Sequence, residues 1–591
     1  MKITITTLAA FLLAGFIHWR QPQNTSQLTT RQSTARQSNA RQTALLKKQR
    51  TALTCAPNRD LFDPAANTVP LLPGWGSYRM PVTTTNDSSY LYFQQGINLY
   101  YGFHIIEALA SFDKSTRFDS SFAMGYWGVA LAYGPNINDD GYTASPKALA
   151  AAQKAQTLSA NSNPAEKALI TAMQTRYSGD STKTRQQLDQ AYIDAMALAF
   201  KLHPESQDIG ALYADAMMQP HPWDLYDRWG KPKAWTPPIV QTLETVLKTN
   251  AAHPGAAHYY IHAVEASDHP ERALAVSDEL PSLMPGVAHL VHMPAHIFIR
   301  TGYYNKGWTV NADAVKGYKD YLGRYPAVEA SSPLYLIHNL HMQATCAIMD
   351  GRYKDALQTS YDTRNSFDSS LLSAPGFFGT FVQYVYMFPL YTQLRFGKWD
   401  SILNTPAINS NYVYADLLSH FCRGIAFARK GRIPDADREL VALHRDTATG
   451  NSQLNSPAPN YANPGINGAR VAEKILAGVI AEAKQNYDLS ITLLKQAADL
   501  EDEMIYNEPK DWLQPARQFL GNVQLKAGRY PDAEQTFRAD LQANPQNGWS
   551  YTGLATALEK QGKQKEAATT RALAQKAFTR GDTKITSAVI Q

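Results

Sequence analysis

The residues best suited to chemistry in this chain are histidines gathered between His253 and His341. The chain has 591 residues and fifteen histidines, so an even spread would place about two in a window of this length. The window holds nine. Several are three or four residues apart, the spacing that puts side chains on one face of a helix. This stretch therefore predicts a metal-binding patch built on neighbouring helices.

Two pairs of histidines are separated by four residues: His258 with His262, and His292 with His296. On a helix their Cβ atoms would lie about 6 Å apart, close enough to share one metal ion. Adjacent helices pack at about 8–10 Å, so two such pairs could complete one coordination sphere. We expect these four histidines to be ligands, with Glu265 as a further ligand, an orienting partner or a catalytic acid/base.

His289, His338 and His341 could complete a second site in the same stretch. Histidine-rich ligation without cysteine suits zinc, iron and copper alike, so the identity of the metal stays open. Pro294 complicates the geometry, because a proline removes a backbone hydrogen bond from a helix interior. Either the helix bends at this proline, or it starts near Met293 and leaves His289 and His292 in a loop.

Other residues have weaker cases for a site. His253 precedes a glycine-containing turn and His269 precedes a proline, so both are expected in loops or caps. Arg517 is a candidate for binding an anionic substrate, whereas Glu508 fits ordinary capping near a helix start. A lone histidine on a helix is most often structural or exposed, so the prediction of a metal depends on the paired spacing.

The elements that would position these histidines are helices in a repeat. The phrase Gly-Arg-Tyr-Pro-Asp-Ala begins at Gly528, and a related phrase begins 34 residues later at Gly562. Similar phrases begin at Gly351, Gly397 and Gly431. Glycine followed by alanine and phenylalanine at fixed offsets recurs as Gly96, Ala108, Phe112 and as Gly521, Ala533, Phe537. Small residues at such positions let two helices pack closely, and glycine tolerates the bend between them.

This pattern resembles the tetratricopeptide repeat, a helix–turn–helix unit. The resemblance implies an all-α protein, with a tetratricopeptide-like α-solenoid covering most of residues 85–580. It also implies that a fixed set of positions on the first helix of each unit lines a concave groove. Aligning the turn phrases puts seven histidines and one glutamate on such positions of three consecutive helices: His258, His262, Glu265, His289, His292, His296, His338 and His341.

The chain also resembles, more specifically, a widespread group of largely uncharacterised bacterial multi-repeat proteins. The phrases that carry this resemblance are YFQQGINLYYGF, YWGVALAYGPNIND, HPWDLYDRW, HPGAAHYYIHAVEAS, HLVHMPAHIFIRTGYY, NEPKDWLQPARQFLG and NPQNGW. They span nearly the whole of the expected folded region. The resemblance implies no particular reaction.

Composition suggests how the rest of the chain is organised. Lys2 precedes an apolar run from Ile3 to Ile17, which is shorter than the ~20 residues that span a bilayer. We therefore expect a signal peptide, or alternatively an uncleaved anchor. The expected segments are a signal or anchor at 1–20, a low-complexity tether and irregular lead-in at 21–84, a solenoid at 85–445 with its histidine-rich groove at 253–341, an Asn/Pro/Gly-rich loop at 446–467 and C-terminal repeats at 468–580. Five prolines and three tryptophans predict a further loop at 219–240.

The overall charge of +5 comes from the N-terminal segment, which has eight Lys/Arg and no acidic residue in positions 1–50. The remainder carries about −3, so it has no bulk basic charge of the kind that binds nucleic acid. An export signal predicts a periplasmic or cell-surface location, with membrane contact only through the N-terminus or the basic tether. The three cysteines, Cys55, Cys346 and Cys422, are too scattered for a disulfide framework or a cysteine-based zinc site.

Two functions remain open from the sequence. One is an exported metal-binding protein, in one version a metal-dependent enzyme acting on a small molecule or peptide in the groove. The other is a non-catalytic repeat scaffold whose groove binds a peptide or a protein partner. The register of the histidines favours metal binding, but it does not favour any particular reaction.

Overall fold

Helices that follow one another in the chain pack side by side through the described residues. The structure is a computed structural model that describes residues 59, 62–139, 142–324, 333–448, 451–458 and 462–591. These residues contain no strand apart from a single bridge between Tyr226 and Pro232. They belong to one compact unit, Arg50–Gln591. The described chain is therefore all-α, as predicted.

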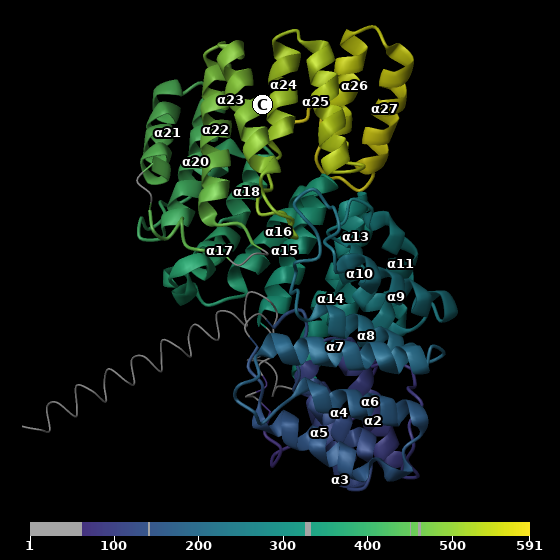
Figure 1. The fold of residues 1–591 in the computed structure, drawn as a ribbon. Helices are drawn as coiled ribbons and strands as arrows, with labels where there is room; N and C mark the ends of the chain where they lie inside the picture. Colours follow the sequence, from purple (N-terminus) through teal and green to yellow (C-terminus); the bar gives the residue numbers. More distant parts are fainter. Residues whose placement is uncertain (1–58, 60–61, 140–141, 325–332, 449–450, 459–461) are drawn as a thin grey trace, which may run out of the picture. The chain divides into compact units, whose positions relative to one another are not determined.

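The first part of the array runs from α2 to α13 (Figure 1). Its helices are α2 (Asp87–Tyr101), α3 (Ile105–Phe118), α4 (Ala123–Ala132), α5 (Pro146–Leu158), η2 (Ser159–Asn161), α6 (Pro164–Arg176), α7 (Arg185–Leu202), α8 (Gln207–Met218), α9 (Thr236–Thr249), α10 (Pro254–Val264), η3 (Pro270–Ala273), α11 (Leu274–Leu283), α12 (Ala288–His292) and α13 (Pro294–Thr301).

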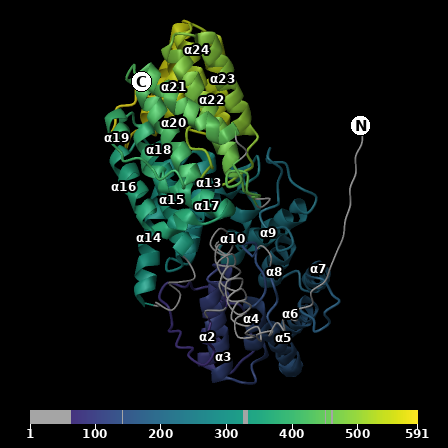
Figure 2. The same cartoon turned by 90° about the vertical axis from the view of Figure 1, so that its left-hand side faces the viewer.

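The second part runs from α14 to α27, and its helices α20 to α24 stand beside one another in two perpendicular views (Figure 1 and Figure 2). Its helices are α14 (Tyr304–Arg324), α15 (Pro333–Met349), α16 (Tyr353–Asn365), η5 (Ser369–Ser373), α17 (Gly376–Tyr386), α18 (Phe388–Arg395), α19 (Trp399–Leu403), α20 (Val413–Arg429), α21 (Ile433–Ala448), α22 (Gly465–Ala483), α23 (Tyr487–Asp502), α24 (Ala516–Lys526), α25 (Tyr530–Ala543), α26 (Gly548–Lys560) and α27 (Gln564–Ala577).

The glycines of the repeated phrase make the turns between paired helices. All have a positive φ, between 65° and 81°, a conformation that glycine adopts without steric cost. They are Gly302, Gly351, Gly397, Gly431, Gly528 and Gly562. In every case the next helix begins two residues later, at Tyr304, Tyr353, Trp399, Ile433, Tyr530 and Gln564. The sequence phrase is thus a turn signal, as the repeat pattern predicts.

Close helix packing accounts for the other repeated residues. A Cβ atom on Gly96 would lie 2.6 Å from the ring of Phe112, and one on Gly521 would lie 2.6 Å from Phe537. These are the glycine and phenylalanine positions that recur at a fixed offset in the sequence. The paired helices, the glycine turns and this packing together form a tetratricopeptide-like α-solenoid, which confirms the predicted fold.

The irregular segment before α2 is bound to the first repeats. The side chain of Gln95 accepts a hydrogen bond from Leu72 N, and that of Gln94 accepts one from Met80 N, both at 2.8 Å. Trp75 in this segment is buried. Residues 62–86 therefore form part of the folded unit, in the region where the sequence predicts an irregular lead-in. The predicted signal at 1–20 and the tether up to residue 58 lie outside the described residues.

Two predicted loops have slightly different bounds in the structure. Helix α9 begins at Thr236, so the last residues of the expected 219–240 loop are helical. Two consecutive prolines, Pro237 and Pro238, lie in its first turn. Backbone N–H groups there have no acceptor within the helix, so a proline removes no helical hydrogen bond. The Asn/Pro/Gly-rich segment lies between the end of α21 at Ala448 and the start of α22 at Gly465. Among the helices described, none has both the length and the apolar character needed to cross a membrane.

Pro294 divides one helical stretch into α12 and α13. Met293, at the junction, keeps helical backbone angles (φ −49°, ψ −38°) and donates a hydrogen bond to His289 O. The proline takes the first turn of α13, a position where it is well tolerated. Both earlier histidines therefore lie on a short helix instead of a loop. His289, His292 and His296 keep a common helical register through the proline.

Candidate metal centre

Seven histidines from four helices converge within the described chain. His258 and His262 lie on α10, His289 and His292 on α12, His296 on α13, and His338 and His341 on α15. All are buried except His338, which is half-buried. The sequence predicted this set, and the structure brings its side chains into one continuous cluster with ring centroids 4.7–6.3 Å apart along it, His341 excepted.

The cluster divides into two trios whose ring nitrogens lie within 4.8 Å of one another. The first histidine trio is His258, His262 and His289, and the second histidine trio is His292, His296 and His338. This division differs from the predicted set of four ligands, because each helical pair is completed by a histidine from another helix segment. His289 completes the first trio, and His338 completes the second.

In each trio, Nε2 atoms of neighbouring rings lie close together. The Nε2 atoms of His258 and His289 are 3.2 Å apart. His296 Nε2 lies 2.9 Å from that of His292 and 3.5 Å from that of His338. Four nitrogens at 2.0–2.1 Å around a tetrahedral zinc ion are separated by about 3.3 Å. The observed spacing is therefore close to that of a ligand set.

Hydrogen-bond acceptors occupy the opposite ring nitrogen of three histidines, and two carboxylates lie beside that of a fourth. Nδ1 of His258 lies 2.6 Å from Tyr101 O, and Nδ1 of His262 lies 2.9 Å from Glu265 Oε1. Nδ1 of His292 lies 2.7 Å from Asn311 Oδ1. The amide of Asn311 is fixed in this orientation because its Nδ2 donates to a backbone carbonyl of its own helix.

Glu265 and Glu508 hold the fourth of these rings, His296. Its Nδ1 lies 2.7 Å from Glu265 Oε2 and 2.9 Å from Glu508 Oε2. An acceptor at Nδ1 requires the proton there, which leaves Nε2 of the ring for another partner. His258, His262, His292 and His296 consequently all direct Nε2 into the cluster. Nε2 of His262 is buried and has no hydrogen-bond partner among the described residues.

Burial and neighbouring charges set the ionisation of the cluster. Burial lowers the pKa of His258, His289 and His338 well below the usual range, and together with His296 it lowers that of His292 to about 3. Burial acts the same way on His296, but the carboxylates of Glu265 and Glu508 outweigh it and raise that pKa to about 10. Most of the rings are thus neutral, as metal ligands must be.

The two glutamates differ in their freedom to react. Burial would raise the pKa of Glu265, but His296 and His262 hold it well below its usual range, so this carboxylate stays ionised between two rings. Burial raises the pKa of Glu508 above its usual value despite the hydrogen bond from His296. Glu265 is therefore placed to orient two histidines, whereas Glu508 is better placed to exchange a proton.

Two strained aromatic residues press on the first histidine trio. Phe103 and Trp223 both have a positive φ, 56° and 57°, which is uncommon for residues other than glycine. The Phe103 ring centroid lies 4.4 Å from that of His258 and 5.7 Å from those of His262 and His289. Trp223 lies edge-on to His262 at 5.2 Å. Such backbone strain gathers at functional sites, where surrounding packing maintains it.

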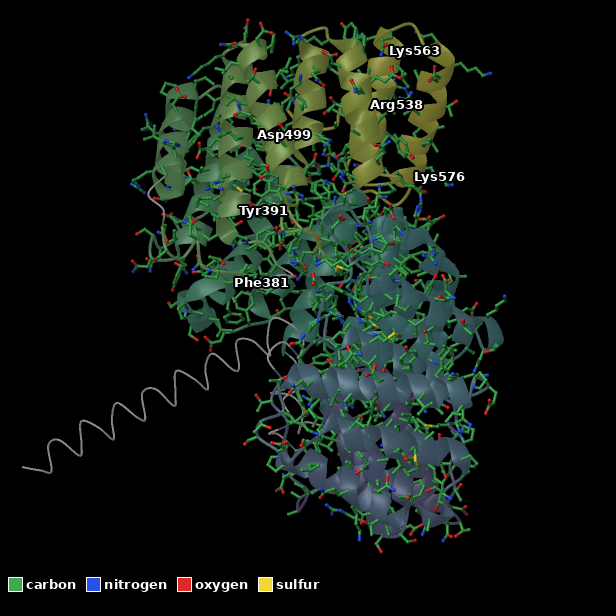
Figure 3. The ribbon with its side chains drawn as sticks, viewed as in Figure 1. Phe381, Tyr391, Asp499, Arg538, Lys563 and Lys576 are labelled. Carbon is green, nitrogen blue, oxygen red and sulfur yellow. The ribbon has the colours of Figure 1, made fainter. Side chains whose placement is uncertain are left out.

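A cavity of about 170 Å³ opens against both trios. Four histidines of the two trios, together with His341, Glu265 and Glu508, line one part of it. Much of the remaining wall is apolar, and it includes Phe381, which lies on α17 and is labelled in Figure 3. A metal ion held by either trio would therefore border a space large enough for a small molecule.

The other predicted residues lie apart from the two trios. His341 lines the cavity with its ring edge-on to Phe388, but it joins neither trio. Arg517 forms an ion pair with Asp502 and does not line the cavity. His253 caps α10 by accepting a hydrogen bond from Ala256 N, and it is fully buried. His269 is exposed beside η3.

Four residues of the site were not predicted from the sequence in this role: Glu508, Asn311, Phe103 and Trp223. Glu508 lies in the segment between α23 and α24, far along the chain from His296, and no spacing pattern links the two. Its neighbourhood resembles an ordinary helix start. Trp223 carried a weak signal, because it lies in a proline- and tryptophan-rich loop of the kind that often covers a site.

No protein-family model matches this chain, and no curated protein matches it. Among solved structures, the human IFIT1 dimer with m7Gppp-AAAA is 11% identical, with 84% of this chain and 91% of that chain covered and a TM-score of 0.26. The P58(IPK) TPR domain is 12% identical, with 84% and 99% covered and a TM-score of 0.20. The APC/C hetero-tetramer Cut9-Hcn1 is 11% identical, with 85% and 97% covered and a TM-score of 0.26. At these TM-scores we draw no conclusion from them about the site.

Proposed function

We propose that this tetratricopeptide-like repeat protein binds transition-metal ions in its two histidine trios, at the wall of the cavity. The observation that carries the proposal is the arrangement of acceptors behind the rings. Tyr101 O, Glu265, Asn311 and Glu508 fix the Nδ1 protons of four histidines. Ligating histidines in proteins nearly always donate their other ring N–H to such acceptors.

A purely structural cluster of buried histidines would be expected to satisfy its polar atoms internally. Here His262 Nε2 has no hydrogen-bond partner. In the second trio, His292 and His296 bring two Nε2 atoms together at 2.9 Å while each already has an acceptor at Nδ1. A metal ion at the first trio would supply a partner for His262 Nε2, and one at the second trio would replace the proton between the two Nε2 atoms.

The donor set favours zinc, iron or copper, because neutral imidazoles suit these ions and both cysteines in the described residues are buried helix residues outside the two trios. Three histidines leave a coordination position open for water or a substrate, as in catalytic zinc sites. Glu508 lies beside the second trio and lines the cavity. We propose that a metal-dependent reaction on a small molecule takes place there, with Glu508 as the acid/base and Glu265 as the residue that orients His262 and His296.

The repeat scaffold also leaves room for the alternative function, the binding of a peptide or protein partner without metal chemistry. Export to the periplasm or the cell surface likewise stays a prediction, because residues 1–20 lie outside the described part of the chain. The binding of a partner without metal chemistry does not account for the acceptors at the Nδ1 atoms. Metal binding does, and we favour it for this reason.

Zinc uptake by site-directed variants tests the proposal. Untagged protein would be dialysed against zinc and its metal content measured, with helical content followed by circular dichroism. His262→Ala should remove the ion of the first trio, and His338→Ala, at a half-buried position, should remove that of the second. His269→Ala changes an exposed histidine outside both trios and serves as the control. Equal zinc content in all four proteins would refute the assignment of the sites.

A further inference from the structure

The chemistry of the cavity wall indicates what kind of molecule enters it. One part of the wall is apolar and largely aromatic, formed by Trp223, Ile337, Phe377, Phe381 and Tyr384. These residues come from the loop before α9, from α15 and from α17. Apolar cavities of about 150 Å³ hold a single benzene ring. A cavity of about 170 Å³ therefore has room for one aromatic ring or a branched aliphatic group with a short polar arm.

Carboxylates outnumber cations among the residues that line the cavity, where His296 is the histidine whose pKa is raised. Glu265, Glu508 and Asp511 line the cavity, and no lysine or arginine is among the lining residues. His296 already pairs with Glu265 and Glu508, so a carboxylate or phosphate entering this space would meet a wall with an excess of negative charge, which is costly. A cationic group would be favoured, because opposite charges attract strongly where water is excluded.

Of these three carboxylates, Glu508 has the fewest hydrogen-bond partners for its oxygens. Both oxygens of Asp511 accept hydrogen bonds, from Asn507 and from Asn463. Glu265 is held between His262 and His296. Glu508 is 8% exposed, and its Oε1 is buried with no hydrogen-bond partner among the described residues. A buried carboxylate oxygen without a donor is rare in folded proteins, so it points to a donor supplied by a ligand.

We infer that the cavity binds a small amine, with its ammonium group at Glu508 and its ring-sized apolar body against Phe377, Phe381 and Tyr384. The apolar wall provides affinity for the body of the ligand, and Glu508 provides the selectivity for a cation. The inference goes beyond metal binding, because it rests on the wall of the cavity and on Glu508. It applies to the protein with both trios empty, because a bound divalent ion would add positive charge to the same wall.

Phenethylamine, 2-phenylethanol and 3-phenylpropionate provide a matched set of probes, because they share one ring and differ in the charge of the arm. Their binding to the full-length protein would be measured by calorimetry after treatment with a chelator. Hydrogen bonds to charged groups favour phenethylamine over 2-phenylethanol by about tenfold or more in Kd. The carboxylate should bind most weakly. Binding of 3-phenylpropionate as tight as that of phenethylamine, or no binding by any probe, would overturn the inference.

Variants then locate the selectivity. Glu508→Gln should remove the preference for phenethylamine while leaving the affinity for 2-phenylethanol unchanged, which shows that the cavity is intact. Asp511→Asn removes a charge whose oxygens are already hydrogen-bonded, so it should keep most of the preference. Equal loss in both variants, or no loss in Glu508→Gln, would contradict the role of Glu508.

The same experiments separate this inference from the proposal of metal binding. Chelator-treated protein that prefers the amine, from a chain that takes up no zinc, would refute the metal sites and support the amine site. Zinc uptake, with no preference for the amine in the chelator-treated protein, would do the reverse.

Discussion

His292 and His296 face each other through their Nε2 atoms, which are 2.9 Å apart. Behind them, Asn311 holds the Nδ1 proton of His292, and two glutamates hold that of His296. When no metal is present, His296 Nε2 must therefore carry a proton and donate a hydrogen bond, which His292 Nε2 accepts. This agrees with the pKa of His296, which is raised to about 10. A proton thus lies where a metal ion would bind.

Zinc affinity at the second trio should therefore depend on pH. Because the folded-state pKa of His296 is about 10, its Nε2 proton is bound throughout the range from pH 6 to 9. Each ion that takes this nitrogen releases about one proton, so affinity should rise about tenfold per pH unit. Zinc titrations in the His262→Ala variant, which isolates the second trio, would measure the slope. An affinity independent of pH would contradict the assignment of this proton.

Asn311 should influence the affinity of the second trio for metal without being a ligand. Asn311→Leu removes the acceptor for His292 Nδ1, so the ring is no longer fixed with Nε2 towards the trio. Loss of such an outer partner weakens metal binding by about 10–100-fold. Asn311→Asp keeps an acceptor and should restore most of the affinity in the same zinc titration. Equal affinity in Asn311→Leu and the unmodified protein would show that the ring needs no such support.

Glu265 should couple the two trios, because its two oxygens contact one histidine from each. In Glu265→Leu no oxygen remains as an acceptor, so the Nδ1 protons of both histidines lose this partner. We expect weaker zinc binding at both trios, and a loss of about 3–5 kcal/mol in the free energy of unfolding of the metal-free protein. Metal content and chemical denaturation would measure the two effects. A decrease confined to one trio would argue against this coupling.

The turn glycines offer a test of the fold that is independent of the site. Gly302 and Gly431 both have a positive φ, 81° and 72°. A Cβ atom on Gly302 would lie 2.2 Å from Pro545 O, whereas one on Gly431 would meet nothing within 4 Å. Gly431→Ala should cost about 1 kcal/mol from backbone strain alone, and Gly302→Ala about 2 kcal/mol more because of the clash. Equal unfolding free energies would show that the turn at Gly302 does not pack on the loop containing Pro545.

The repeat made much of the fold predictable from the sequence. The glycine phrases marked the turns, because these turns need a positive φ, which glycine adopts without steric cost. The glycine–phenylalanine offsets marked the closest helix contacts. The same register brought seven histidines and Glu265 towards one place. The signal and tether at residues 1–58 stay predictions, since they lie outside the described residues.

The finer arrangement of the site could not be predicted, for physical reasons. Glu508 reaches His296 from a non-helical segment, so no periodicity relates the two residues. Nothing in the sequence indicated that Phe103 has a strained backbone, because the surrounding packing maintains that conformation. The division into trios depends on how α12 and α13 continue through Pro294. The sequence predicted a bend or a loop at that proline, whereas the helical register continues through it.

Metal content is the most direct test of the central claim. Full-length protein purified without a histidine tag would be incubated with zinc, iron or copper, freed of loosely bound ions, and analysed for its elements. Two trios predict about two ions of the preferred metal per chain. Each preparation of the protein should hold at least one such ion per chain. Less than about 0.2 ion per chain with all three metals would contradict the account, because even one formed site should retain more.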